Sequence, residues 1–238
     1  MKIALIGYGK MGKAIEAIAL ERGHEVVLKI DESNTADFNQ ENIAKADVAI
    51  EFTGPHTAYE NIWKAIELGI PLVSGSTGWL DKMSEVEQLC ADKNGAFIYA
   101  SNFSVGVNLF FELNKKLAAL MHPHKEYNVS LEEIHHTQKK DAPSGTAITL
   151  AEGVMETYQA MTKWVNDTAP QPDELLIVSK RIDPDPGTHT IRYTSETDDI
   201  TITHSAHSRK GFALGAVVAA EFLKDKKGIF TMKEVLGL

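Results

Sequence analysis

The stretch from Glu133 to Ala147, EIHHTQKKDAPSGTA, gathers residue types that could do chemistry. Two adjacent histidines, His135 and His136, are followed by the lysines Lys139 and Lys140 and then by a Ser-Gly-Thr turn. An imidazole that titrates near neutrality can act as a general acid or base. The turn opens a helical segment, and the N–H groups of a helix N-terminus favour a carboxylate or phosphate. This combination predicts acid–base chemistry on a bound anion.

The paired histidines do not indicate a metal site. Successive side chains on an extended strand point to opposite faces, so His135 and His136 cannot easily chelate one ion. Cys90 is the only cysteine, so neither a thiolate zinc site nor a disulfide framework can form. We therefore expect no metal, with one imidazole facing a cleft and the other packed elsewhere along its rim.

A second motif, GYGKMG from Gly7 to Gly12, fits the pattern G-x-G-x-x-G. It follows an apolar strand and opens a helix, and Asp31 ends the next strand at close to the expected spacing of roughly 20 residues. Gly7 permits a tight turn, Gly9 lets the backbone approach a pyrophosphate, and Gly12 allows close packing of helix and strand. The motif predicts a dinucleotide site in which Asp31 accepts hydrogen bonds from the adenosine ribose. The alternative is a glycine turn without a ligand.

Two further loops, SGSTG at 74–78 and ASNFSVG at 100–106, follow predicted parallel strands. Ligands of such sheets bind beyond the carboxyl ends of the strands, so both loops should face the same cleft as Gly7. The residues expected at the cofactor are Gly7, Tyr8, Gly9, Lys10, Met11, Gly12, Asp31, Gly75, Ser76, Thr77, Ala100, Ser101, Asn102 and Phe103.

The elements that must position these residues fall into two groups. Strands alternate with helices before residue 106, which indicates right-handed crossovers and a parallel sheet. After Pro170 the segments alternate, are rich in Thr, Ile and Val, and lack helices, which is typical of an antiparallel sheet. The fold class is thus α/β, a Rossmann-type doubly wound parallel sheet plus a smaller α+β domain with a mostly antiparallel sheet. We expect a dinucleotide-binding domain at 1–106, completed by 211–238, and a second domain at 107–210.

The composition of the chain limits the classes of molecule that it is expected to bind. The chain has 33 acidic and 24 basic residues, a net charge of −9, which argues against nucleic acid. No apolar run approaches the roughly 18–20 residues of a membrane span, and the N-terminus lacks a signal-peptide cleavage pattern. We expect a cytoplasmic protein without a membrane partner. In this acidic chain the cluster at 135–140 is a local positive island suited to an anionic small molecule.

Taken together, the motifs resemble the dihydrodipicolinate reductase family, now also called 4-hydroxy-tetrahydrodipicolinate reductases. The family pattern E-x-H-H-x-x-K-x-D-A-P-S-G-T-A is met at 133–147. The glycine motif, GSTG at 75–78, NFSVGVN at 102–108, HSR at 207–209 and the closing GIFTMKEVLGL also match. The resemblance covers nearly the whole chain and departs mainly in the short segment between Asp31 and Ala46.

The resemblance implies reduction of a cyclic dicarboxylate to tetrahydrodipicolinate by NADH or NADPH, in lysine and diaminopimelate biosynthesis. It implies that His135 is the acid/base and that Lys139, rather than Lys140, donates a proton. It also implies a homotetramer built through the sheet of the second domain, without a required metal. The residues that it places at the substrate are His136, Gly145, Thr146 and Arg209.

The residues around Asp31 bear on the choice of cofactor. Asp31 is followed by Glu32, and two successive acids should repel the 2′-phosphate of NADPH. We therefore expect NADH to be preferred, with Lys10 and Lys29 as the cations that could favour NADPH.

Two other functions remain open at this stage. One is another two-domain reductase of a small amino or imino acid, such as an aspartate dehydrogenase-like enzyme, but it would not require HHTQKKDAPSGTA. The other is a nucleotide-sensing binding protein, which should lack a paired acid and base. Turnover of several oxo- and imino-acids with NADH would separate the three.

Overall fold

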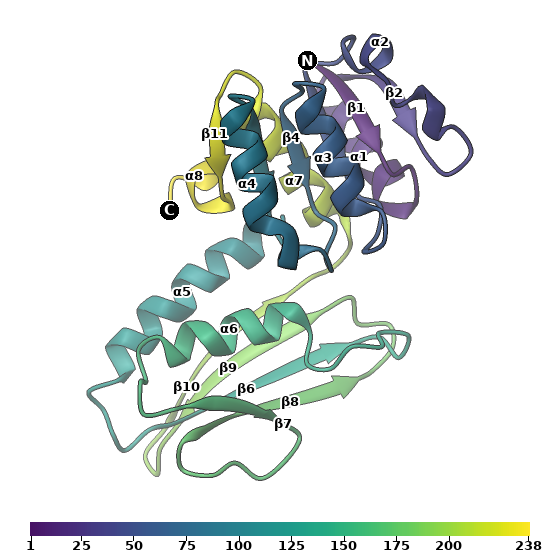
Figure 1. The fold of residues 1–238 in the computed structure, drawn as a ribbon. Helices are drawn as coiled ribbons and strands as arrows, with labels where there is room; N and C mark the ends of the chain where they lie inside the picture. The colour runs from purple at the N-terminus through teal and green to yellow at the C-terminus, as the bar shows by residue number, and fades with distance from the viewer. The chain divides into compact units, whose positions relative to one another are not determined.

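The computed structural model describes all residues from 1 to 238, and the chain divides into two compact units. One unit comprises Met1–Val105 together with Lys210–Leu238, and the other comprises Gly106–Arg209. The purple and yellow ends of the ribbon in Figure 1 therefore belong to the same unit. No helix is both long enough and apolar enough to cross a bilayer.

The first unit is built on a six-stranded sheet with the order β11-β5-β4-β3-β1-β2, in which every pairing is parallel. Its strands are β1 (Lys2–Ile6), β2 (Glu25–Ile30), β3 (Val48–Glu51), β4 (Leu72–Ser74), β5 (Ala96–Tyr99) and β11 (Gly228–Phe230). The central strands are short runs such as KIALI and VAIE whose residues are almost all buried, as expected for a sheet covered on both faces. The C-terminal segment, in which no strand was predicted, contributes the edge strand β11 beside β5.

Helices cover both faces of this sheet (Figure 1). One hydrophobic cluster joins the sheet to α1 (Lys10–Glu21), α7 (Lys210–Leu223) and α8 (Met232–Leu236). The other joins it to α2 (Gln40–Ile43), α3 (Ala58–Glu67) and α4 (Met83–Asp92). The small residues of α7 let it approach closely, since a Cβ at Gly215 would lie 1.7 Å from the carbonyl oxygen of Phe103.

The second unit is a five-stranded sheet with the order β10-β9-β6-β8-β7. Its elements are α5 (Val105–Met121), β6 (Asn128–His135), α6 (Gly145–Met155), β7 (Lys163–Asn166), β8 (Glu174–Arg181), β9 (Thr188–Thr194) and β10 (Asp199–Ser205). The fold class is confirmed, but this sheet is mixed: β6 pairs antiparallel with β9 and parallel with β8, and β7 also pairs parallel with β8. The reason is α6, which lies between β6 and β8 in the chain and returns it to run in the same direction. The short strand β7 was not predicted.

Only one face of the second sheet is covered by helices. The residues of α5 and α6 pack with the inward residues of β6, β8 and β9 in one core cluster, which includes Leu131, Ile177 and Tyr193. Burial alternates along β6 from Asn128 to His135, with every second residue buried. This alternation puts Glu133 and His135 on the same inner face as the apolar core residues.

Candidate functional site

The loops predicted to hold a cofactor meet at one edge of the six-stranded sheet. Strands β1, β2, β4 and β5 end immediately before the predicted segments that begin at Gly7, Asp31, Gly75 and Ala100. Because all six strands are parallel, their carboxyl ends lie at the same edge. The strand order reverses between β1 and β3, and such a switch point is where ligands of doubly wound sheets bind.

The surroundings of each glycine in the first motif explain, in a different way, why a glycine is needed there. Gly7 has φ +96°, and a Cβ there would lie 2.1 Å from the carbonyl oxygen of Phe52. A Cβ at Gly12 would lie 2.3 Å from the carbonyl oxygen of Gly7, so the helix can approach the turn only without a side chain. At Gly9, in contrast, a Cβ would meet nothing within 4 Å. Gly9 is also the N-cap of α1, and no side chain caps the helix, so its first N–H groups are left for a ligand.

A pocket of about 460 Å³ opens at this edge. It is lined by Gly9, Lys10 and Met11, by Phe52–Pro55, and by Gly75, Ser76 and Thr77. The open backbone at Gly9, the uncapped helix and this pocket together fit the pyrophosphate of a nicotinamide dinucleotide. The residues present therefore suit the predicted cofactor.

Glu51, which the motifs did not single out, fixes the walls of this pocket. It is completely buried at the end of β3. Its carboxylate accepts hydrogen bonds from the hydroxyls of Ser74 (2.5 Å) and Ser76 (2.7 Å) and from the N–H of Thr53 (2.8 Å). One buried carboxylate thereby ties together the loops that follow β3 and β4. The sequence signal was an acid at the end of a buried strand, VAIE.

At the end of β2, where the motif predicts the ribose to bind, Asp31 is exposed and already accepts hydrogen bonds. One oxygen accepts hydrogen bonds from the N–H (2.8 Å) and the hydroxyl (2.6 Å) of Ser33, and these bonds lower the pKa of Asp31. The nearby Lys29 ammonium lies 2.5 Å from a carboxylate oxygen of Glu16 and 4.8 Å from the ring centroid of Tyr8. Asp31 thus stays ionised, while the charge of Lys29 is balanced by Glu16.

The stretch after β5 divides into exposed and buried residues. Ala100 is half-buried and Ser101 is exposed, whereas Asn102 and Phe103 are buried. The side chain of Asn102 accepts a hydrogen bond from the N–H of Ser104, and Phe103 packs into the core of the first unit. Neither residue lines the pocket, so any contact of Phe103 with a cofactor would involve its backbone.

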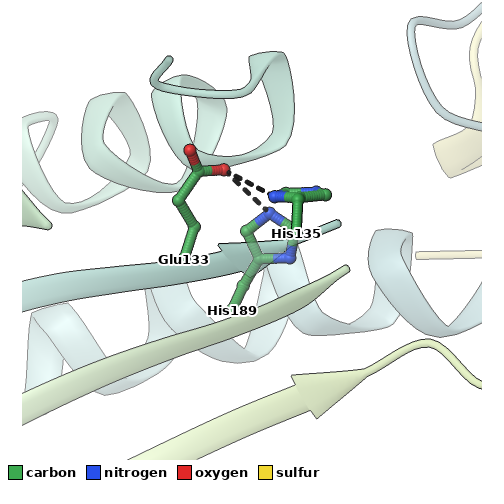
Figure 2. Close-up of side chains that lie close together, drawn as sticks. All are labelled: Glu133, His135 and His189. Carbon is green, nitrogen blue, oxygen red and sulfur yellow. Dashed lines mark ion pairs between the residues drawn. The ribbon is translucent and has the colours of Figure 1, made fainter. Parts of the chain in front are cut away.

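In the second unit, strand register gathers a polar cluster that the sequence did not reveal. Glu133 on β6 lies opposite His189 on β9 and opposite Ser179 on β8, and His135 lies opposite Arg181. The close-up in Figure 2 shows the Glu133 carboxylate and the two imidazole rings pointing toward one another.

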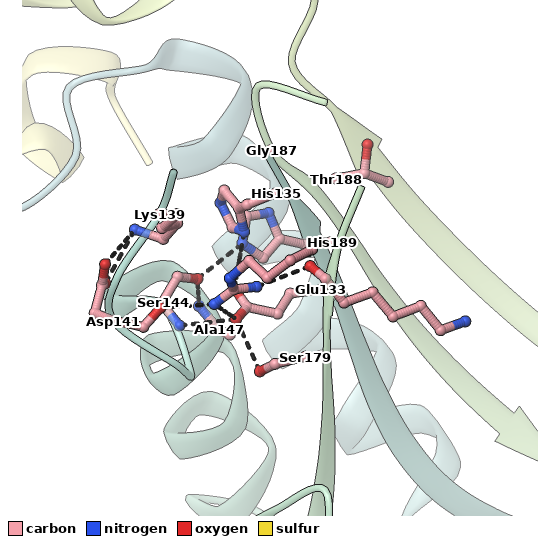
Figure 3. Close-up of polar contacts among 12 residues, drawn as sticks. Glu133, His135, Lys139, Asp141, Ser144, Ala147, Ser179, Gly187, Thr188 and His189 are labelled. Carbon is pink, nitrogen blue, oxygen red and sulfur yellow. Dashed lines mark hydrogen bonds and ion pairs between the residues drawn. The ribbon is translucent and has the colours of Figure 1, made fainter. Parts of the chain in front are cut away.

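Both oxygens of Glu133 are in use. Oε1 accepts hydrogen bonds from the N–H of Ser144 (3.1 Å), the hydroxyl of Ser179 (2.9 Å) and the guanidinium of Arg181 (3.2 Å). Oε2 lies 3.1 Å from Nδ1 of His135 and 3.8 Å from Nε2 of His189. The partners lie on three strands and at the start of a helix, and Figure 3 shows them around the Glu133 carboxylate.

Two members of the cluster have shifted pKa values. Burial alone would raise the pKa of Glu133, but the contacts from His135, Ser144 and Ser179 outweigh it and hold the pKa well below its usual range. For His189, burial and the neighbouring His135 lower the pKa to about 4. At neutral pH the cluster therefore contains an ionised carboxylate and a neutral His189.

Gly187 leaves room for the other edge of His135. A Cβ at Gly187 would lie 3.0 Å from Nε2 of His135, and Gly187 itself has φ +148°, a conformation that side chains rarely adopt. Nδ1 of His135 faces Glu133, so Nε2 is the nitrogen left for another partner.

The two lysines of the motif occupy different environments. The Lys139 side chain is 24% exposed, and its ammonium lies 3.0 Å from the carboxylate of Asp141 (Figure 3). Lys140 is exposed and forms no ion pair. The loop that carries both is anchored by Asp183, which accepts hydrogen bonds from the N–H and hydroxyl of Thr137. His136, on the opposite face from His135, is only partly buried.

The Ser-Gly-Thr turn begins α6 as predicted, but Ser144 is not available to an anion. Ser144 is 2% exposed, its N–H donates to Glu133, and its hydroxyl caps the helix by accepting from the N–H of Ala147. In the first turn of α6, Gly145 is exposed and Thr146 is partly buried. Arg209 is exposed beyond the end of β10, and the structure does not bring it into the cluster around Glu133.

Glu133, His135 and His189 place ligand-type atoms within 4.8 Å of one another, as zinc sites do. The other oxygen of Glu133 is already paired with the guanidinium of Arg181. The positive charge of that guanidinium would oppose the binding of a divalent cation. The separation of 3.1 Å between Oε2 and Nδ1 is also one that a single proton bridges. We interpret the three residues as a proton-linked cluster.

Comparison with known proteins adds independent findings. Models of the N-terminal and C-terminal parts of dihydrodipicolinate reductase match residues 1–103 and 106–236. The 4-hydroxy-tetrahydrodipicolinate reductase of Christiangramia forsetii is 54% identical over the whole chain and 98% of its own length. That of Neisseria meningitidis is 33% identical over 94% of this chain and 84% of its own. The structure of a dipicolinate-bound dihydrodipicolinate reductase from a Paenisporosarcina species has the same fold, with a TM-score of 0.76 at 24% identity and 97% coverage of both chains.

Proposed function

The chain belongs to the dihydrodipicolinate reductase family, and from this premise we propose how its residues divide the work. The reaction is the reduction of 4-hydroxy-tetrahydrodipicolinate to tetrahydrodipicolinate with a nicotinamide cofactor, in lysine and diaminopimelate biosynthesis. His135 acts as the acid/base and Lys139 as the proton donor. Gly145 and Thr146 bind a substrate carboxylate, with His136 and Arg209 as further substrate contacts.

The observation that carries this assignment is the link between His135 and the N-terminus of α6. Nδ1 of His135 and the N–H of Ser144 contact the two oxygens of one buried carboxylate, that of Glu133. An acid/base and an anion-binding turn are therefore held at a fixed separation. A substrate whose carboxylate binds at Gly145 and Thr146 would have its ring brought toward the same side of the unit as His135.

The chemistry requires these groups. Reduction of the substrate's conjugated C=C–C=N system consumes one hydride and one proton. A bound nicotinamide supplies the hydride. The protein must hold a dianionic substrate within an acidic chain and must deliver the proton to the carbanion-like centre. Beside the turn, Lys139 is placed to donate the proton and His135 to act as the acid/base, and Lys139 also adds local positive charge.

The environment of Asp31 supports a preference for NADH. Asp31 keeps its charge because the bonds from Ser33 lower its pKa, and Glu32 follows it with a second acid. Lys29, one of the two cations considered for NADPH, is paired with Glu16 at 2.5 Å. A 2′-phosphate would thus meet like charge without an available partner on β2. Such a like-charge arrangement disfavours NADPH.

The assay that tests this function measures kcat/KM for both cofactors with 4-hydroxy-tetrahydrodipicolinate formed in situ. We expect turnover with NADH to exceed that with NADPH by roughly 10–100-fold, a difference of about 1.4–2.7 kcal/mol. Asp31→Ala should narrow this ratio, and Asp81→Ala, an exposed acid outside the cofactor pocket, serves as the matched control. A higher kcat/KM with NADPH than with NADH would contradict the proposed preference for NADH. Equal turnover of unrelated oxo- and imino-acids would instead favour the alternative reductase.

We also propose that the protein assembles as a homotetramer through the sheet of the second unit, in the cytoplasm. Helices cover only one face of this sheet. The outward residues of the other face include the apolar side chains Ile134, Leu176 and Val178 beside hydroxyl-bearing Thr190 and Thr203. A partly apolar, uncovered sheet face supports its use as a subunit interface.

A further inference from the structure

Two facing atoms of the cluster, like Nδ1 of His189, are buried without a directed hydrogen bond. They are Oε2 of Glu133 and Nδ1 of His135, and they lie 3.1 Å apart. Glu133 is 0% exposed and His135 is 7% exposed, so water does not readily satisfy either atom. If Nδ1 carries the imidazole proton, it can donate to Oε2 and both atoms are satisfied. If Nε2 carries it, two lone pairs face each other, and each unsatisfied buried atom costs about 1–3 kcal/mol.

The carboxylate is held so that it cannot turn away from this contact. Three donors from two different elements converge on its other oxygen, Oε1: the N–H of Ser144 at the start of α6, and the hydroxyl of Ser179 and the guanidinium of Arg181 on β8. Any rotation of the carboxylate would break these bonds. Glu133 is therefore fixed by its neighbours, and it in turn fixes the ring of His135.

The geometry points to Glu133 as the positioning residue that keeps the proton of neutral His135 on Nδ1 and leaves Nε2 to exchange a proton with the substrate. This inference rests on the proposed role of His135 as acid/base. The orientation of the ring agrees with it, because Nδ1 faces Glu133 while Nε2 faces Gly187, where the absence of a side chain leaves space. Through Ser144 the same carboxylate also sets the distance to the turn that binds the substrate carboxylate.

A glutamine at position 133 would reverse the tautomer with almost no change in volume. The three donors at Oε1 require an oxygen there, so the amide oxygen of the variant must occupy that place. Its NH2 group is then directed at Nδ1 of His135. Because an NH2 group donates, Nδ1 must accept, and the proton of the neutral ring moves to Nε2. Nε2 would then carry the proton of the neutral ring, so it could no longer accept a proton.

The test combines a spectroscopic and a kinetic measurement on the full chain. Long-range ¹H–¹⁵N NMR of histidine-labelled protein, at a pH where the imidazole is neutral, reports which nitrogen of His135 is protonated; the resonance is assigned by its loss in His135→Asn. We expect Nδ1–H in the native protein and Nε2–H in Glu133→Gln. We also expect kcat to fall by roughly 10²–10⁴-fold, the scale known from a serine protease whose histidine is held in the wrong tautomer.

The control is Glu156→Gln, which removes a carboxylate from the same unit that pairs with Lys115 at 2.7 Å on the surface. It should change neither the tautomer nor kcat, and NADH affinity should be unchanged in both variants. An Nε2–H tautomer in the native protein, or an unchanged tautomer in Glu133→Gln, would overturn the inference. A reversed tautomer with normal kcat would show that Glu133 determines which nitrogen of His135 is protonated. It would also show that His135 is not the acid/base of the proposed mechanism.

Discussion

Replacing Lys139 by alanine should lower kcat by roughly 10²–10⁴-fold, the usual contribution of a positioned general acid. Lys140→Ala should cost far less, through a weaker local field alone. The structure gives a physical basis for this contrast. The Lys139 ammonium is largely covered and is held 3.0 Å from Asp141, whereas Lys140 extends into solvent without an ion pair. Steady-state kinetics of both variants, with 4-hydroxy-tetrahydrodipicolinate as the substrate, measure the difference.

NADH binding separates a loss of the proton donor from a loss of the fold. Fluorescence titration should give nearly the same Kd for NADH in the native protein and in both lysine variants, because the glycine motif lies in the other unit. If Lys140→Ala proves the more damaging change, or if both variants keep their kcat, the donor role does not belong to Lys139.

Two glycines of the first motif should respond in opposite ways to the same substitution. Gly9→Ala should leave stability nearly unchanged, because its Cβ meets nothing within 4 Å in the protein. The new methyl group would stand where a pyrophosphate approaches the N-terminus of α1. Losing two charge-assisted hydrogen bonds of about 1.5 kcal/mol each would raise the Kd for NADH by roughly 100-fold.

Gly7→Ala should instead destabilise the fold. Its Cβ would lie 2.1 Å from the backbone oxygen of Phe52, and alanine is strained at φ +96°. We expect a loss of roughly 2–5 kcal/mol in the free energy of unfolding. Urea unfolding and NADH titration of the two variants test the pair together. A stable Gly9→Ala variant that binds NADH normally would show that the cofactor does not use this loop.

The architecture of the cofactor site could be predicted from the sequence because its determinants are local. Each strand of the first unit is a short apolar run that ends in its own loop, and parallel strands place all of those loops at one edge. The glycine motif and Asp31 need no knowledge of distant pairings. The loops at 75–77 and 100–101 follow the same rule, whereas the side chains of Asn102 and Phe103 are buried and do not line the pocket.

The cluster around Glu133 could not be predicted because it depends on the register of strands far apart in the chain. His189 and Ser179 lie opposite Glu133 only because β9 and β8 pair with β6 in one particular alignment. A shift of one residue would send both side chains to the other face. One local signal was present: the alternation in NVSLEEIH places Glu133 at a core-facing position, where an unpaired acid would be costly.

The mixed character of the second sheet escaped prediction for a related reason. The Thr- and Ile-rich segments correctly indicated strands, but residue type does not fix the direction in which a strand pairs. The α6 crossover makes β6 and β8 parallel, and the short KWVN segment adds β7 beyond β8. The partners of Glu133 on β8, Ser179 and Arg181, depend on this parallel alignment.

The most direct test of the central claim is a crystal structure of the protein with NADH and pyridine-2,6-dicarboxylate, a planar mimic of the substrate. We predict that one carboxylate of the mimic accepts hydrogen bonds from the N–H groups or hydroxyl of Gly145 and Thr146. Its ring should then lie within reach of Nε2 of His135 and of the Lys139 ammonium, and the pyrophosphate of NADH should lie against Gly9. A mimic bound away from the N-terminus of α6, with His135 and Lys139 uninvolved, would contradict the assignment of this site.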